Sequence, residues 1–511
     1  MWSHVLEVRL LAPDGLAQRV HEIAIPPGLG WLSLRATYEG TRVLNLFLID
    51  AEGSVRLQYW GLRPGETMLV RGDVGDRAQG FWPGAVPGPL PPGRWTVLVG
   101  ALPDGQSTPL YRLELAGDAG PAPALDQTET RPHLWTTAPG RHGMLQAYTL
   151  YDWQRPLARG SRWYRGDLHM HTLLSDSRLT ARQLSDLARG AGLDFGIITE
   201  HNALTTAWCD TPLLVIPGVE FTSTRGHWNA LGVRFFPVLL HEGGPALQTE
   251  EGMEQLLRVH GGQGTVCSLN HPLLPPWQWR WDDTAVDLFE TVEILNDPTY
   301  PDNDRATQAA LDVWDALWAR GQRLWGVGGA DVHFLPGESH VPGGPPQRVG
   351  DPTTCVWAEE LSADAILAGI RRGRVYVTRG PRLDPRIEAD GRACLPGDEV
   401  RADGGGERPP VSVVYRLGIE GAPAGGVLRW LENGREVETA ALAGDGRFEL
   451  RRQWPRGVYR WLRAEVRDAD GRLAAFTNPV YASPPDPLPT RWRDVAPAGG
   501  PAPADEERET A

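Results

Sequence analysis

The sequence has no lysine: all 50 of its basic residues are arginine, and 64 acidic residues outnumber them. We attach no function to the missing lysine. The net charge of −14 is unfavourable for generic nucleic-acid binding, which requires a basic surface. Cysteine is also scarce, with four widely spaced residues and no Cys-x-x-Cys pair. This scarcity excludes a zinc ribbon and a disulfide framework.

Long apolar runs are missing as well. No stretch reaches the roughly 20 apolar residues that a membrane-spanning helix needs, so we expect no membrane association. The first residues lack the basic start and the apolar core of a secretory signal peptide. Together with the cysteine pattern, these absences lead us to expect a cytoplasmic protein.

What the sequence does have is length, with many glycines and prolines. Its 511 residues exceed one ordinary domain, and about three domains are expected. Residues 1–160 and 381–485 contain short alternating apolar runs between turn signals, which is typical of β-sandwiches. Residues 161–380 alternate between predicted strands and helices. Residues 486–511 are rich in proline and alanine and then acidic, so we expect them to be disordered.

The predicted fold is therefore multidomain, with an α/β domain between two all-β domains. Within the middle domain, Thr180 is placed to cap a helix that runs to about Gly190, and Ser362 to cap one that runs to Gly373. We expect the first sandwich to be a structural cap on the middle domain rather than a binding module.

One stretch stands out in the middle domain, Asp167-Leu168-His169-Met170-His171. The residues before it favour a β-strand, on which residues two apart point to the same side. His169 and His171 are then expected to aim two imidazoles at one point, while Leu168 and Met170 face the other way. Two converging imidazoles make half of a divalent-metal shell.

The same pattern continues along the domain, because histidine and acidic residues recur where an apolar strand meets a loop. They are found at Glu200-His201, Glu220, His227, His271, Asp331 and His333. In an α/β barrel this rim is where catalytic groups gather. Packing alone does not explain polar residues repeated at strand ends while the strand bodies stay apolar.

In sequence order, these motifs resemble the PHP superfamily, named for polymerase and histidinol phosphatase. The resemblance covers about residues 163–380 and rests on His169-x-His171, Ser175-Asp176, Ile198-Thr199-Glu200-His201-Asn202, Gly218-Val219-Glu220, Gly226-His227, Asn270-His271-Pro272 and Gly329-Ala330-Asp331-x-His333. A narrower resemblance, to the CehA/McbA branch of metallohydrolases, rests on Gly226-His227-Trp228-Asn229, Val292-Glu293-Ile294-Leu295-Asn296 and Gly350-Asp351-Pro352-Thr353-Thr354.

The resemblance implies a distorted (β/α)7 barrel that holds two or three divalent metal ions. By motif, the first ion would be held by His169, His171, Glu220 and Asp331. Glu220 would bridge to a second ion held by His227 and His271, and a third would use Asp176, His201 and His333. Two alternatives stay open: His227 as a structural rim residue, and Asp331 as a residue that orients a ligand. Asp176 lies in Ser-Asp-Ser where the family usually has Ser-Asp-Gly.

Mixed histidine and carboxylate shells without thiolate suit Zn²⁺, Mn²⁺ or Fe²⁺. The expected mechanism is attack by a metal-bridging hydroxide on phosphorus or carbonyl carbon. Glu220 and Asp331 would act through the metals. His201, His333 or a metal-bound water would protonate the leaving group, and the sequence leaves this choice open. No serine nucleophile elbow, P-loop or dinucleotide-binding fingerprint is present.

The expected partner is a small-molecule substrate. Candidate substrate contacts are Asn296, Arg280, Trp279, His340 and Arg348. Trp277, Trp279 and Trp281 would wall a pocket or serve as core anchors, with equal weight on each. His241 and His260 lie outside the motifs and are interpreted as surface or packing residues.

The leading interpretation is a metal-dependent hydrolase of a phosphate ester. The first alternative is an ester or carbamate hydrolase of the CehA/McbA type, whose neutral substrate needs no arginine. The second alternative is a carbohydrate- or surface-binding protein with an inactive barrel. A nuclease role is disfavoured by the acidic chain. The sequence says nothing about the oligomeric state.

Overall fold

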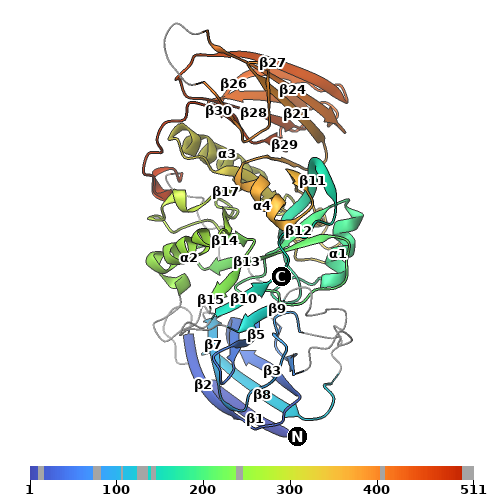
Figure 1. Cartoon of the computed structure of the whole chain (residues 1–511), viewed down its shortest axis with the longest axis vertical. Coiled ribbons are helices and arrows are strands. Elements are labelled where there is room, and N and C mark those ends of the chain that lie inside the picture. Colours follow the sequence, from blue (N-terminus) through green and yellow to red (C-terminus); the bar gives the residue numbers. More distant parts are fainter. Residues whose placement is uncertain are drawn as a thin grey trace.

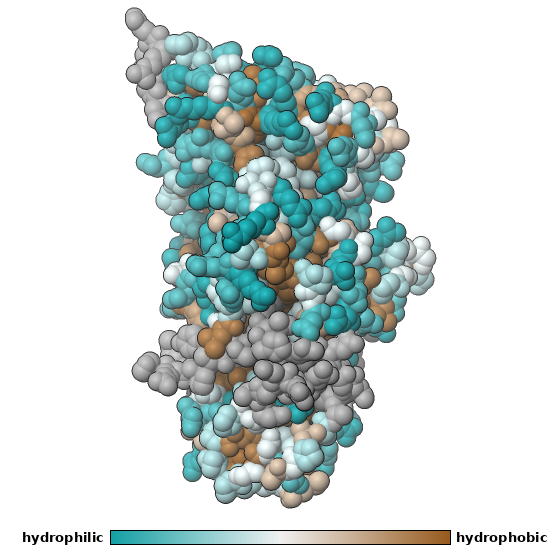
Figure 2. All heavy atoms as spheres, turned by 45° about the vertical axis from the view of Figure 1, so that its right-hand side comes forward, coloured by the Kyte–Doolittle hydropathy of each residue, from teal (hydrophilic) through white to brown (hydrophobic). Residues whose placement is uncertain are grey.

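The computed structural model describes residues 1–9, 17–61, 63–72, 82–104, 108–123, 136–139, 146–237, 246–402 and 409–497. Figure 1 shows an elongated molecule in which a β-rich N-terminal part, a central part with helices and a β-rich C-terminal part follow one another along the long axis. Several β-sheets dominate, so the multidomain architecture expected from the sequence is confirmed. On the face in Figure 2, hydrophilic side chains cover most of the described surface, and apolar ones form separate patches.

The N-terminal part is built from eight strands, β1 (Trp2–Arg9), β2 (Ala17–Ile25), β3 (Trp31–Glu39), β4 (Thr41–Ile49), β5 (Val55–Gly61), β6 (Glu66–Arg71), β7 (Gly93–Pro103) and β8 (Leu110–Asp118). They form two four-stranded antiparallel sheets, in the orders β1-β8-β3-β6 and β2-β7-β4-β5. Alternate residues of β3 are buried, as expected for a strand with one face on a core. The buried faces share one hydrophobic cluster that contains Tyr59 and Trp95.

A small three-stranded sheet of β9 (Thr136–Pro139), β10 (Gln146–Leu150) and β15 (Phe235–Pro237) follows. This sheet combines β9 and β10, which precede the central part, with β15, which belongs to the central part.

Seven strands carry the central part: β11 (Arg159–Met170), β12 (Phe195–Ile198), β13 (Leu214–Ser223), β14 (Gly226–Leu231), β16 (Val266–Leu269), β17 (Thr291–Asn296) and β18 (Trp325–Gly329). They are neighbours in chain order within one sheet. β11, β12 and β13 pair in parallel, β14 pairs antiparallel with β13 and β16, and β16, β17 and β18 are again parallel. A parallel bridge between Met170 and Val332 brings the two outer strands of this series together.

The described residues form four α-helices, α1 (Ala181–Gly190), α2 (Glu250–Gly262), α3 (Asn303–Ala319) and α4 (Ala363–Arg371). As predicted, Thr180 caps α1 by accepting the Gln183 amide, and Ser362 caps α4 by accepting the Ala365 amide. A regular (β/α)7 barrel is not shown, because four helices are too few for seven repeats and because β14 runs antiparallel to both its neighbours. None of the described helices is long and apolar enough to span a bilayer.

The C-terminal part shares a sheet with the central part. On the far side of β11 the sheet continues through β19 (Thr353–Glu360), β20 (Val375–Thr378), β29 (Leu473–Thr477), β28 (Arg460–Arg467), β25 (Val427–Glu432) and β26 (Arg435–Ala441), with β23 (Glu399–Val400) and β30 (Val480–Ala482) beside it. A second sheet contains β22 (Arg392–Cys394), β21 (Arg382–Ala389), β24 (Val411–Glu420) and β27 (Gly446–Trp454). A hydrophobic cluster lies between the two sheets. The predicted boundary near residue 380 therefore falls within a continuous sheet.

The beginning of the tail that we expected to be disordered is packed. Trp492 is 2 % exposed, and its indole N–H donates to the Trp279 carbonyl. Thr490 is also buried. The expectation of disorder is therefore wrong for residues 486–497, because an indole offers enough apolar area to anchor a proline-rich segment. Residues 498–511 lie outside the described residues.

Candidate metal centre

The centre starts at the end of β11, where the alternation predicted from the sequence is present. His169 and His171 are fully buried with ring centroids 5.1 Å apart. Leu168 and Met170 are buried in two separate hydrophobic clusters. The strand thus presents two imidazoles to one side and anchors itself with the apolar residues between them.

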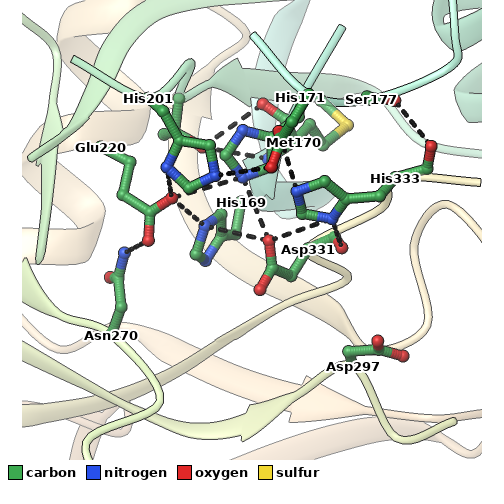
Figure 3. A network of polar contacts seen from close by, with 12 residues as sticks. His169, Met170, His171, Ser177, His201, Glu220, Asn270, Asp297, Asp331 and His333 are labelled. Atoms are coloured by element: carbon green, nitrogen blue, oxygen red, sulfur yellow. Dashed lines mark hydrogen bonds and ion pairs between the residues drawn. The ribbon is translucent and has the colours of Figure 1, made fainter. Parts of the chain in front are cut away.

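Two carboxylates meet these imidazoles (Figure 3). His169 Nε2 lies 3.3 Å from both Glu220 Oε2 and Asp331 Oδ1. His171 Nε2 lies 3.5 Å from Glu220 Oε2 and 3.1 Å from Asp331 Oδ1. The structure therefore brings together all four residues that the resemblance assigned to a first ion. These four atoms are buried and have no hydrogen-bond partner in the described part of the chain.

The other oxygen of Glu220 faces a second set of side chains. Glu220 Oε1 lies 3.1 Å from His227 Nδ1 and 3.5 Å from His271 Nε2, and it accepts the Asn270 amide at 2.9 Å. Glu220 is on β13 and His227 on β14, and the antiparallel pairing of these strands brings them together. Glu220 thus lies between two groups of imidazoles, as a bridging ligand would.

The third predicted set surrounds Asp176. Its two oxygens lie 3.2 Å from His201 Nε2 and 3.1 Å from His333 Nε2. The His171 ring stacks 4.5 Å from both His201 and His333. These four residues form one group that could hold a metal ion. The predicted set left out His171, which lies between the first and third groups.

The grouping of the remaining ligands differs in part from the prediction. Compact sets that could hold an ion combine His271 with His169 and Asp331, and His227 with His201 and Glu220. Because these sets share members, the nine predicted ligands form one connected cluster rather than three separate shells.

Burial and mutual charge set the protonation of this cluster. Burial alone would raise the pKa values of Asp176 and Glu220, but neighbouring imidazoles hold both well below their usual range. Burial alone would lower the pKa of His201, yet the carboxylates of Asp176 and Glu220 raise it well above its usual value. The same balance raises the pKa of His333 to about 9. Burial, together with the charges of His333 and His201, lowers the pKa of His171 to about 4.

Two ligand positions have unusual backbone geometry. His271 has a φ of 26° and Asp331 a φ of 49°. Non-glycine residues rarely adopt positive φ, and such strain accumulates at functional sites where surrounding structure holds it in place.

Three buried carboxylates behind the cluster hold it in place. Glu293 Oε1 lies 2.9 Å from His169 Nδ1, and Glu293 Oε2 accepts the His271 amide at 3.0 Å. Asp167 accepts three backbone amides, and burial raises its pKa to about 7. Glu200 accepts the Ser175 hydroxyl at 2.5 Å and so fixes the loop that carries Asp176.

Sequence reasoning quoted Glu293 within a motif but gave it no role. Its position three residues before Asn296 on a strand that ends at the predicted rim was a usable signal. Trp60 was missed entirely. Its ring lies 4.6 Å from the ring of His201, although it belongs to the N-terminal sandwich, and no local pattern connects the two residues.

The predicted substrate contacts are only partly at the centre. Asn296 lies inside it, and its amide donates to Glu293 Oε2 at 3.1 Å and to Asp331 Oδ2 at 3.4 Å. His340 lies at the edge, with Nε2 2.5 Å from Asp297 Oδ2. Its ring is 5.0 Å from that of Tyr300.

The remaining substrate predictions do not hold as made. Trp279 is 3 % exposed and Trp281 is 1 % exposed, so both are core anchors. Trp277 is 37 % exposed, with its ring 6.4 Å from that of His271, and so takes the place expected for Trp279. Arg280 is exposed and donates to the Thr224 carbonyl instead of pointing at the cluster.

Arginine does not reach the cluster. Arg348 is exposed, and within the described ranges no arginine forms an ion pair with Asp176, Glu220 or Asp331. His260, interpreted from the sequence as a surface or packing residue, is fully buried among aromatic rings, which confirms a packing role. His241 lies outside the described residues.

Comparisons with known proteins give weak likenesses. No protein-family model and no curated protein matches the chain. A two-domain protein from Bacteroides vulgatus ATCC 8482, named as containing a predicted PHP-like metal-dependent phosphoesterase, is 18% identical with a TM-score of 0.33, over 67% of this chain and 100% of that one. A protein from Bifidobacterium adolescentis ATCC 15703, named provisionally as a metal-dependent phosphoesterase, is 16% identical with a TM-score of 0.24, over 42% of this chain and 96% of that one.

At these TM-scores the likeness assigns neither fold nor function. Both names describe metal-dependent phosphoesterases, and the first contains the term PHP-like. Neither name refers to the CehA/McbA branch, which stays a prediction.

Proposed function

We propose that this chain is a PHP-type metal-dependent hydrolase of a phosphate ester. One observation carries the proposal: four buried polar atoms of His169, His171, Glu220 and Asp331 converge at 3.1–3.5 Å without a hydrogen-bond partner in the described part of the chain. Unpaired buried polar groups are costly. A divalent cation among them would satisfy all four at once, and histidine with carboxylate is the donor set that Zn²⁺, Mn²⁺ and Fe²⁺ favour.

The residues divide the work of such a site. His169, His171, Glu220 and Asp331 would hold one ion, while Glu220 would share its second oxygen with an ion near His227 and His271. When bound, two adjacent ions lower the pKa of a shared water and neutralise charge that develops on transition-state oxygens.

The group around Asp176 would bind a further metal ion. Its ligands would be Asp176, His171, His201 and His333. We leave the proton donor to the leaving group open between His201, His333 and a metal-bound water. In keeping with the resemblance, we assign the strands from β11 to β18 to a distorted barrel, whose ends are joined at the bridge of Met170 and Val332.

Charge favours a phosphate ester over a neutral substrate. As metal ligands the six imidazoles would be neutral, so the cluster would offer only the three negative charges of Asp176, Glu220 and Asp331. Three divalent ions would therefore leave the loaded centre clearly positive. Such a centre attracts a phosphate dianion even though no arginine of the described residues pairs with its carboxylates, because a bound metal is often the largest local charge in its site.

An ester or carbamate hydrolase is the second candidate, and two observations favour it. Within the described residues no arginine pairs with the cluster carboxylates, and the exposed Trp277 beside His271 offers an apolar surface at the rim. A neutral acyl substrate needs no cationic clamp, and an indole face binds flat apolar groups.

The deciding experiment is a matched assay of the full chain reconstituted with Mn²⁺, Zn²⁺ or Fe²⁺. It scores turnover of an aryl phosphate, a bis-aryl phosphate, an aryl acetate and an aryl carbamate. His169→Ala is the inactive control. His4→Ala, on β1 of the N-terminal sandwich, controls for loss of a histidine elsewhere.

Phosphate turnover that His169→Ala abolishes and His4→Ala retains is the expected result. Turnover confined to the acetate or carbamate would replace the phosphoesterase proposal with the acyl-hydrolase alternative. Activity that His169→Ala retains would contradict the metal centre itself.

A further inference from the structure

The N-terminal sandwich reaches into the metal centre through the turn that follows β5. Trp60, at the end of this strand, lies with its ring 4.6 Å from that of His201. Trp60 is 8 % exposed, so it is wedged between the sandwich and the imidazole. A ring packed on one face of His201 restricts the directions in which its nitrogens can point.

Arg63 in the same turn holds the neighbouring loop. Its Nη1 donates to the Ser177 carbonyl at 3.0 Å, and its Nη2 donates to the Leu173 carbonyl. These two carbonyls flank Asp176, the carboxylate between His201 and His333. The guanidinium fork thus fixes both ends of the short loop that presents this carboxylate.

Further contacts show that the loops after β11 and β12 are part of the packing of the sandwich and do not merely touch its surface. Gln58 Oε1 accepts the Leu204 amide at 3.0 Å, and the Thr206 hydroxyl donates to the Pro83 carbonyl at 2.9 Å. Leu174 and Ala203 are buried members of the sandwich's own hydrophobic cluster. The loops that carry Asp176 and His201 are therefore anchored to the sandwich as well as to the central part.

The rest of the cluster is held differently. His169 and the backbone of His271 are fixed by Glu293, which lies on β17 of the central part. Glu220 is fixed by Asn270, at the end of β16. The two sides of the metal centre thus depend on different domains.

We propose that the N-terminal sandwich is a structural component of the metal centre, and that Trp60 and Arg63 are positioning residues for the ion held by His171, Asp176, His201 and His333. The inference rests on the proposed function, because it requires that this cluster binds metal. It predicts that this one ion is held by two domains, whereas the ion at His169 depends on the central part. Loss of Trp60 or Arg63 should selectively release the ion held at Asp176, His201 and His333.

The test is metal content and affinity, measured on the full chain. Arg63→Met removes the donors but keeps the apolar stem, and Trp60→Leu removes the aromatic ring. Arg35→Met is the matched control, because Arg35 donates to the Gly65 carbonyl within the same sandwich. Asp176→Asn serves as the reference for loss of the ion itself.

Each protein is stripped with chelator, loaded with Zn²⁺ or Mn²⁺, and analysed by elemental mass spectrometry and titration calorimetry. Circular dichroism checks that each variant is folded. Arg63→Met and Trp60→Leu should weaken one ion about 10- to 100-fold, the usual effect of removing support behind a ligand. Arg35→Met should match the wild type, and adding Arg63→Met to Asp176→Asn should cause no further loss.

The outcomes separate this inference from the proposed function. If the wild type binds ions and folded Arg63→Met and Trp60→Leu bind the same number with unchanged affinity, the inference is overturned alone. Equal weakening of every ion would also overturn it, since the effect would not be confined to one group. A wild-type chain that binds no divalent ion would overturn the proposed function, and this inference with it.

Discussion

His169 Nδ1 lies 2.9 Å from Glu293 Oε1, on the side of the ring opposite to Glu220 and Asp331. With Nδ1 donating to Glu293, Nε2 is the nitrogen that faces the cluster and that would bind a metal ion after giving up its proton. A carboxylate behind a ligand histidine sets its tautomer and raises its basicity. The pair therefore orients the His169 ring so that Nε2 faces Glu220 and Asp331.

Glu293→Gln removes this negative charge with little change in shape. We expect metal affinity to fall about 10- to 100-fold while the fold is retained. Glu290→Gln is the matched control, because Glu290 accepts the Cys267 amide and touches no imidazole of the cluster. Competition with a chromogenic chelator measures both. Equal affinities in the two variants would show that Glu293 has no special role.

Removing the metal should destabilise the protein. Without ions, buried atoms of His169, His171, Glu220 and Asp331 are left without partners. A ligand that binds only the folded state adds about 2.7 kcal/mol when present at 100 times its Kd. Chelator should therefore lower the Tm in differential scanning fluorimetry, and added Mn²⁺ or Zn²⁺ should restore it. A His169→Ala protein with the same metal-dependent shift would place the binding elsewhere.

Trp277 and Trp279 should respond in opposite ways to replacement by alanine. Trp277 is exposed beside His271, so Trp277→Ala should leave stability nearly unchanged and raise the KM for aryl substrates. Trp279 is buried, so Trp279→Ala should cost about 3–5 kcal/mol of stability. Urea unfolding and steady-state kinetics on both variants check this. A loss of stability in Trp277→Ala as large as that in Trp279→Ala would refute the assignment.

His260 should make the protein sensitive to acid. It stacks on Phe235 at 5.1 Å, and burial lowers its pKa from the usual 6.5 to about 3. Between these values the unfolded chain binds a proton that the folded chain does not, so stability must rise with pH, by up to about 1.4 kcal/mol per unit. Above pH 6.5 His260 is neutral in both the folded and the unfolded chain and adds no pH dependence. As the pH is lowered from 6.5 toward 3, its effect lowers the free energy of unfolding.

His260→Leu removes this proton linkage, whatever constant effect it has on packing. The stability of the variant relative to the wild type should therefore increase as the pH falls from 6.5 toward 4, measured by urea unfolding. A difference that does not vary with pH would show that His260 is already protonated in the fold, or hydrated.

The parts of the centre that could be predicted are those with a local signal. The period of two in a strand was enough to aim His169 and His171 at one point. Polar residues at strand ends were enough to expect Glu220 and Asp331 at the same rim, and the family resemblance then assigned them to the ion at His169 and His171. Apart from that assignment, these inferences use only the geometry of a strand and the repeated hand-over from strand to loop.

The parts that could not be predicted depend on distance in the sequence or on packing. Nothing near Trp60 signals that its ring will meet His201, because the contact depends on how two domains dock. Trp277 and Trp279 have the same local composition, and only the fold decides which is exposed. The packing of Trp492 was missed because the proline-rich composition of this segment predicts disorder, and composition does not show that one tryptophan packs into the core.

The membership of Leu174 and Ala203 in the N-terminal core also bears on how the protein is made. A chain leaves the ribosome N-terminus first, and domains generally fold as units in that order. All strands of the sandwich are therefore synthesised before its hydrophobic core is complete. The core is completed only when the loops around Asp176 and His201 emerge. Until then an apolar patch beside Trp60 stays uncovered, and such patches are where nascent chains aggregate or bind chaperones. The surface that we propose to support the metal centre in the folded protein is thus exposed during its synthesis.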